Sequence, residues 1–169
     1  KLREIEKPIV CAVNGVAAGA GANIALACDI TVAKKSSAFI QAFSSIGLIP
    51  DSGGTFFLPR LVGMQKAAAL MMLADKVSAE EAESMGMIYK SFEDESFESE
   101  AMAIVDKLSK RPTVGIGLTK KLLNETYQND LAEQLNREGQ EQVVAAASKD
   151  YKEGVAAFLE KRKPSFTGE

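Results

Sequence analysis

The sequence predicts an α/β fold in which a layer of strands and helices is followed by a helical C-terminal region. The first half alternates short apolar, β-branched runs with helical patterns, whereas the pattern from about Glu98 to Arg162 is helical throughout. The 169 residues are 46% apolar and 25% charged, which suffices for one globular domain with a real core. We expect residues 1–97 to form the β/α core and residues 98–169 to form the helical region.

The first strand is expected at Ile9–Val13, an apolar run that Asn14-Gly15 ends as a turn. The Ala- and Gly-rich segment that follows should end in a short helix packed closely on its neighbours. Asp29–Ala33 is the next expected strand, so this order predicts a parallel βαβ unit with a right-handed crossover. Another short strand is expected at "AFIQAF".

Three helices and one strand should complete the first half. A short helix is expected at Thr55–Val62 and a longer one at "QKAAALMMLAD". Ser78 followed by Glu81 is a capping box, which predicts a helix start. "MIYKSF" is the last expected strand.

The second half predicts four helices without an internal repeat. Asp150 followed by Glu153 resembles another capping box and should begin the last of them. The four segments are "SEAMAIVDKLSKR", "TVGIGLTKKLLNETY", "LAEQLNREGQEQVVAAAS" and "YKEGVAAFLEKRK". These helices either form an oligomer interface or cover the same core, and the pattern alone does not separate the two.

Composition and charge exclude several functions. The net charge is −3 and no long basic block is present, so a nucleic-acid surface is not expected. No apolar run has membrane-spanning length and no signal peptide is visible. Cys11 and Cys28 lie in apolar stretches and are interpreted as buried free thiols of a reducing, cytoplasmic compartment.

The absence of histidine is the most informative feature of the composition. It excludes Ser-His-Asp and Cys-His catalysis by this chain, and no closed metal site is expected. Any acid–base chemistry therefore falls to Asp, Glu, Lys, Tyr or Cys. We expect no metal and no cofactor.

A glycine-rich turn, Gly19-Ala20-Gly21, precedes the first expected helix. Main-chain N–H groups at a helix N-terminus are unpaired and can bind a phosphate or stabilise an oxyanion. A dinucleotide-binding turn is a weak alternative, because six residues separate Val13 from Gly19 and Ile24 occupies the third glycine position. A close-packed helix entry without a ligand is the structural alternative.

Asp51 lies in the segment Pro50-Asp51-Ser52-Gly53-Gly54. Locally this is ordinary turn and helix-capping chemistry. The functional interpretation is a catalytic acid/base, because an apolar neighbourhood would desolvate the carboxylate and make it a better base. That neighbourhood would come from Ile46, Leu48, Ile49, Phe56 and Phe57.

The segment from "KPIVCAVNGVAAGAGANIALACD" through "SSIGLIPDSGGTFFLPRLVG" resembles the crotonase, or enoyl-CoA hydratase/isomerase, superfamily. The resemblance continues through "ADKVSAEEAESMGMIYK" to "FLEKRKPSF" and covers essentially all 169 residues. It implies a ClpP/crotonase-like ββα spiral core and C-terminal helices that build homotrimers, commonly paired into hexamers. It also implies an acyl-CoA substrate, with coenzyme A present only as part of that thioester.

The same resemblance assigns roles to individual residues. It places one oxyanion donor at the N–H of Ala20, with the second donor in a segment before Lys1. Hydratases of the family use two glutamates, and the corresponding positions here are Asn23 and Phe43. Water addition by the usual two-carboxylate route is therefore not expected.

"GLIPDSGGT" followed by "LPRLVG" is similar to the ring-1,2-epoxyphenylacetyl-CoA isomerase branch, in which an aspartate at the position of Asp51 is the acid/base. We therefore predict a thioester isomerase that uses Asp51. Enoyl-CoA hydratase, a non-catalytic acyl-CoA-binding homologue, and an Asp51 nucleophile as in dehalogenase relatives remain alternatives. The residues expected to contact substrate are Gly19, Gly21, Asn23, Phe43, Phe158 and Lys161.

Phe158 and Lys161 resemble positions that approach the nucleotide of coenzyme A, often across a subunit boundary. A lysine there can pair with a phosphate. A solvated basic end of an amphipathic helix explains the same residues without a ligand.

Overall fold

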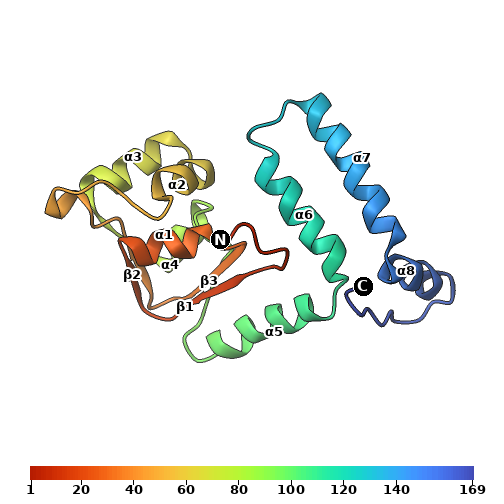
Figure 1. Ribbon diagram of the computed structural model, residues 1–169. Coiled ribbons are helices and arrows are strands. Elements are labelled where there is room, and N and C mark those ends of the chain that lie inside the picture. Colours follow the sequence, from red (N-terminus) through yellow and green to blue (C-terminus); the bar gives the residue numbers. More distant parts are fainter. The chain divides into compact units, whose positions relative to one another are not determined.

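The computed structural model describes all 169 residues (Figure 1). Two compact units emerge: Ile9–Ala103 forms one, and Lys1–Pro8 together with Ile104–Glu169 forms the other. The predicted domain division into residues 1–97 and 98–169 stays a prediction.

The unit of residues 9–103 contains two small sheets and the helices between their strands. The strands are β1 (Val10–Val13), β2 (Val16–Ala18), β3 (Ile30–Lys34), β4 (Ala38–Ile40), β5 (Lys76–Ser78) and β6 (Lys90–Phe92). The helices are α1 (Ala20–Ala27), the 3-10 turn η1 (Ser44–Ile46), α2 (Gly54–Val62), α3 (Met64–Leu73), α4 (Ala79–Ser84) and the start of α5 (Phe97–Ser109).

The first four strands alternate between the two sheets. One sheet has the order β1-β3-β6 with parallel pairs, and the other has the order β2-β4-β5, in which β2 and β4 are parallel and β4 and β5 antiparallel. β1 and β2 thus enter different sheets before the chain forms α1. The next two strands, β3 and β4, then pair with β1 and β2, respectively. This arrangement is the ββα spiral that the resemblance implied, and it confirms the predicted parallel relation of β1 and β3 across α1.

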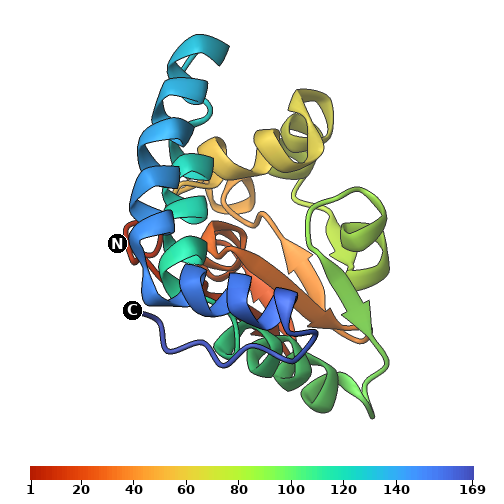
Figure 2. The same cartoon turned by 90° about the vertical axis from the view of Figure 1, so that its right-hand side faces the viewer.

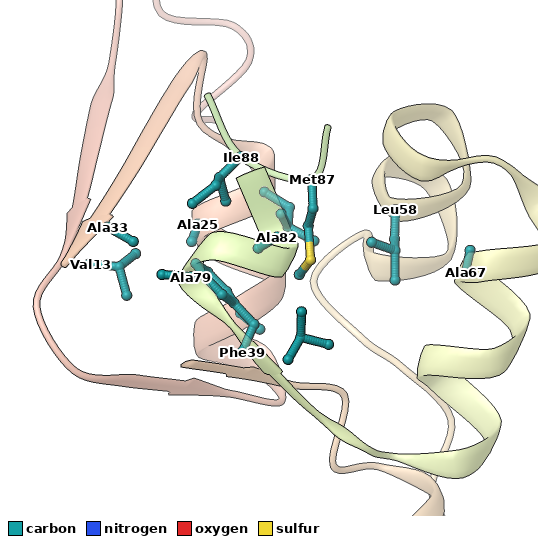
Figure 3. Packing of buried hydrophobic residues seen from close by; sticks show 13 residues of the cluster. Val13, Ala25, Ala33, Phe39, Leu58, Ala67, Ala79, Ala82, Met87 and Ile88 are labelled. Carbon is teal, nitrogen blue, oxygen red and sulfur yellow. The ribbon is translucent and has the colours of Figure 1, made fainter. Parts of the chain in front are cut away.

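Small side chains dominate the core of this unit (Figure 3). Phe39 and Leu58 are its largest fully buried apolar residues. Alanines of α1 and α4 belong to this core, and their small side chains let the backbones approach closely. Truncation of Leu58 to alanine should cost roughly 2–5 kcal/mol of stability because the cavity cannot close fully.

Two strands of this unit were not expected from the sequence. β2 and β5 have only three residues each, and both belong to the second sheet. The predicted capping box of α4 is confirmed: the Glu81 N–H donates to Ser78 Oγ and the Ser78 N–H donates to Glu81 Oε2. β5 therefore runs directly into a capped helix.

The other unit is helical. It contains the remainder of α5, α6 (Thr113–Glu125), α7 (Leu131–Ala147) and α8 (Lys149–Leu159). Helices α6 and α7 lie side by side and antiparallel in both views (Figures 1 and 2). Glu141 joins them, because its carboxylate accepts from Lys121 of α6 at 2.8 Å and from Arg137 at 3.0 Å. None of the helices combines the length and the apolar character that spanning a membrane requires.

The predicted capping box at the start of α8 is wrong. Ser148 is the N-cap, and its hydroxyl accepts from the Tyr151 N–H. Asp150 is buried instead and accepts from the N–H groups of Thr167 and Gly168. The C-terminal tail therefore folds back onto α8, and its N–H groups bind the Asp150 carboxylate, which the local spacing had assigned to a helix cap.

The N-terminal segment is tied to α6. Lys120 is buried, and its ammonium donates to the carbonyls of Leu2 at 2.8 Å and Lys7 at 3.1 Å. Arg3 and Asn124 exchange two hydrogen bonds across the same contact. These bonds fix the chain just before it enters β1.

Candidate functional site

The glycine-rich turn lies between β2 and α1. Gly19 has φ 53° and ψ −123°, a conformation that favours glycine, and it serves as the N-cap without a side-chain hydrogen bond. Its carbonyl accepts from the Asn23 N–H, which is the first bond of the helix. The N–H groups of Ala20, Gly21 and Ala22 precede that bond, so they have no partner within the helix and lie at its positive end. Ala20 is thus the first residue of α1, and the role of its N–H as an oxyanion donor stays a prediction.

Two neighbours hold this turn in place. The Gly19 N–H donates to the Ile40 carbonyl at the end of β4, over 2.9 Å. The ring of Phe43 lies 3.5 Å from the position where a Cβ of residue 19 would stand. The structure therefore brings Phe43 beside the predicted oxyanion turn. Contact of Phe43, Gly19 or Gly21 with a substrate stays a prediction.

Asp51 lies on an exposed turn that leads into α2. Its carbonyl accepts two hydrogen bonds, from Asn23 Nδ2 at 2.9 Å and from the Gly54 N–H at 2.8 Å. Ser52 and Gly53 follow with φ values of 50° and 81°, and Gly53 rather than Asp51 is the N-cap of α2. The Asp51 carboxylate has no hydrogen-bond or ion-pair partner in the protein, and its role as acid/base stays a prediction.

Asn23 is fully buried and connects the two turns. Its Nδ2 donates to the Asp51 carbonyl and its Oδ1 accepts from Gln41 Nε2 over 2.8 Å. A Cβ at Gly54 would lie 2.3 Å from Asn23 Nδ2, so only glycine fits there. Both ends of the Asn23 amide bind protein groups. Asn23 exposes no surface in this chain, so the structure offers no atom of Asn23 for the predicted contact with substrate.

The apolar residues expected around Asp51 do not enclose its side chain within this chain, because most of them are exposed. Ile49 is 83% exposed and Ile46 is 71% exposed; Leu48 and Phe56 are also exposed, and Phe57 is half-buried. Four large apolar side chains near Asp51 in the sequence are thus exposed, and exposed apolar surface of this kind can mark a binding surface.

Phe158 and Lys161 belong to the helical unit, whereas the residues above belong to the other unit. Phe158 is exposed and, with Tyr151, Val155 and Phe166, lines an apolar groove of about 420 Å³. Lys161 follows α8 with φ 54°, and its ammonium has no partner in the protein. Both side chains are available to a ligand, and their predicted contact with coenzyme A stays a prediction.

Gln41 was not recognised from the sequence. It follows β4 directly and is buried, with 3% of its surface exposed. A single polar residue within the apolar run "AFIQAF" was the signal that could have indicated it, because buried amides need hydrogen-bond partners. No group of three or more His, Cys, Asp or Glu residues is placed to hold a metal ion.

Comparison with known proteins defines the class to which this fold and site belong. The family model described as "Enoyl-CoA hydratase/isomerase" matches residues 1–169. The chain belongs to the enoyl-CoA hydratase/isomerase family, and its α/β core is crotonase-like.

Individual relatives carry both kinds of name. The chain is 48% identical over 168 residues to a 1,2-epoxyphenylacetyl-CoA isomerase of Escherichia coli, covering 99% of this chain and 64% of the relative. It is 47% identical over 161 residues to a "probable enoyl-CoA hydratase" of Rhodobacter capsulatus, covering 95% and 63%. An enoyl-CoA hydratase structure from Polaromonas superimposes with a TM-score of 0.94 at 36% identity, covering 98% of this chain and 65% of that one. The chain thus spans slightly less than two thirds of the length of these relatives.

Proposed function

We propose that the protein containing this chain isomerises acyl-CoA thioesters through an enolate, with Asp51 as the acid/base. The N–H of Ala20 is one oxyanion donor in this proposal. The observation that carries it is the bond from Asn23 to the Asp51 carbonyl, because it ties a free carboxylate to the helix whose N-terminus offers the donor. The 48% identity to an isomerase supports the same choice.

The proposed reaction needs only one carboxylate. The Asp51 carboxylate removes a proton from an acidic carbon of the acyl group, and the electron pair moves to the thioester oxygen as the enolate forms. The Ala20 N–H donates to that oxygen and stabilises the charge. Protonated Asp51 then returns the proton to a different carbon, the double bond shifts, and the carboxylate is regenerated.

Hydration is the second candidate, because hydratase names are common among the relatives. The residues argue against it. The two positions at which the resemblance places the hydratase glutamates hold Asn23 and Phe43, and neither side chain can take a proton at neutral pH. Asn23 is also committed to two hydrogen bonds within the protein.

The surroundings of Asp51 suit an apolar acyl group. Ile46, Leu48, Ile49 and Phe56 expose their side chains on the same segment as the carboxylate. An acyl group bound on them would exclude water from Asp51 and strengthen it as a base. In the same proposal Phe158 and Lys161 contact the nucleotide of coenzyme A, and the helical unit assembles homotrimers or hexamers.

The deciding experiment follows 2-enoyl- and 3-enoyl-CoA esters in D₂O with the protein expressed from its complete gene. The proposal predicts migration of the double bond with incorporation of solvent deuterium and little 3-hydroxyacyl-CoA. Hydration of crotonyl-CoA as the main reaction would support the second candidate. Tight binding of a panel of esters without turnover would leave a non-catalytic acyl-CoA-binding protein.

A further inference from the structure

We infer that Gln41 and Asn23 form a buried amide pair that positions the turn of Asp51, and that Gln41 is a positioning residue of the proposed active site. This inference rests on the proposed function for its kinetic consequence. The amide pair itself is a property of the fold and is tested separately below.

The end of β4 supports both halves of the site. The Ile40 carbonyl accepts from the Gly19 N–H and so fixes the turn that carries the Ala20 donor. The next residue, Gln41, donates from Nε2 to Asn23 Oδ1 over 2.8 Å. Asn23 Nδ2 in turn donates to the Asp51 carbonyl over 2.9 Å. Two consecutive residues of one strand end thus reach the oxyanion turn and the acid/base turn.

The pair fixes the orientation of the Asn23 amide. The main-chain carbonyl of Asp51 can only accept and therefore takes Asn23 Nδ2, which leaves Asn23 Oδ1 facing β4, where Gln41 Nε2 donates to it and completes the pair. If the amide were reversed, two acceptor oxygens would face each other at the turn. Gln41 therefore acts on Asp51 through Asn23, although it contacts no atom of Asp51.

The amide oxygen of Gln41, Oε1, bears on why position 41 holds a polar residue. Gln41 Oε1 is buried and no protein group donates to it. Burying an acceptor without a protein partner is unfavourable, so an apolar side chain of similar size would suit the packing better. Glutamine at this position makes sense if its Nε2 donor is needed.

Gly54 contacts both the Asp51 carbonyl and the Asn23 amide. The Gly54 N–H donates to the same Asp51 carbonyl that Asn23 binds. A side chain at residue 54 would overlap the Asn23 amide, with its Cβ 2.6 Å from Asn23 Cγ and Oδ1. Asn23 is thus confined between Gln41, Gly54 and the carbonyl that it holds.

The test compares Gln41→Met with Gln65→Met, a matched control on the exposed surface of α3. Hydrogen–deuterium exchange of the peptide containing Gly54 measures the turn directly. We expect faster exchange in Gln41→Met only, together with a fall in kcat of about 10²-fold with KM little changed, because a misplaced base loses reactivity more than binding. Wild-type exchange in Gln41→Met would overturn the amide pair.

Gln41→Glu provides a second variant of nearly native size. Its protonated carboxyl can donate to Asn23 Oδ1 and its ionised form cannot, so kcat should be near that of the wild type at low pH and fall as pH rises. A pH profile that keeps the wild-type shape would overturn the positioning role. Asp51→Asn keeps the main-chain carbonyl and should leave exchange at Gly54 unchanged, so failure of the proposed chemistry is distinguishable from failure of the amide pair.

Discussion

Asn23 Nδ2 donates to the main-chain carbonyl of Asp51 over 2.9 Å, and thereby joins two residues that lie 28 positions apart in the sequence. The bond holds the turn of Asp51 through its backbone and leaves the carboxylate free. The acid/base role that we propose for Asp51 needs this combination of a fixed main chain and an unbound acid group.

Gly54→Ala should disturb this relationship from outside the amide pair. The new Cβ would lie 2.3 Å from Asn23 Nδ2, and Gly54 is buried, so Asn23 must shift. We expect a loss of about 1–3 kcal/mol in the free energy of unfolding and a fall in kcat of about 10²-fold. Gly15→Ala is the control, because a Cβ there meets nothing within 4 Å. Equal kinetics and stability for the two variants would contradict the close contact.

Gly19→Ala should affect the oxyanion turn. Its φ of 53° with ψ of −123° is unfavourable for residues with a Cβ, although the Cβ itself would make only an ordinary contact with Phe43, at 3.5 Å. The turn should relax and move the Ala20 N–H, so kcat should fall by about 10²- to 10³-fold while ester binding changes less. Binding measured by calorimetry and turnover measured on the same preparation separate the two effects. Unchanged turnover in Gly19→Ala would contradict the proposed role of the Ala20 N–H as an oxyanion donor.

The Cys11 thiol should react slowly. Burial chiefly, and the neighbouring Cys28, raise the pKa of Cys11 from 9.0 to about 11. Because the thiolate is the nucleophile, iodoacetamide should alkylate Cys11 much more slowly at pH 8 in the folded protein than in urea. The raised pKa favours the neutral thiol in the fold, so its contribution to stability is present below about pH 9 and is lost as pH rises toward 11. Equal rates in buffer and urea would contradict this environment.

The attachment of Ser165 to Glu153 should be lost in acid. The Arg162 guanidinium and the Ser165 N–H hold the pKa of Glu153 down, from 4.5 to about 2. A lowered pKa stabilises the fold above the unfolded value and this contribution is lost as pH falls, so the window lies between about pH 4.5 and pH 2. NMR shifts of the Ser165 amide should report release in this window. Glu153→Gln should weaken the attachment at pH 7, and an unchanged Ser165 signal in that variant would contradict the ion pair's role.

Local patterns in the sequence were sufficient for most of the elements. The βαβ relation of β1 and β3 follows from β-branched runs around an Ala-rich helix, and the capping box at Ser78 follows from spacing alone. β2 was missed because its three residues, "VAA", carry no alternating pattern. Asp150 was misassigned because its actual partners, Thr167 and Gly168, lie 17 and 18 residues further on.

At the candidate site, too, contacts between residues far apart in the sequence were not predictable. The glycine pattern was enough to predict a free N–H at Ala20, and the resemblance was enough to single out Asp51. The support of Asp51 was not predictable, because Gln41 lies 18 residues from Asn23 and only the folded chain brings their amides together. The exposure of Ile46 and Ile49 also differs from the expected enclosure, since adjacency in sequence does not determine which side chains face inward.

The acid/base role of Asp51 is best examined with Asp51→Asn in the protein expressed from its complete gene, by the rate of double-bond migration and of deuterium uptake from D₂O. The Asp51 carboxylate has no partner in the protein, so stability should change by less than about 0.5 kcal/mol and ester binding should persist. We predict that migration and deuterium uptake fall together by about 10²- to 10⁴-fold. Isomerisation at the wild-type rate in this variant would contradict the account.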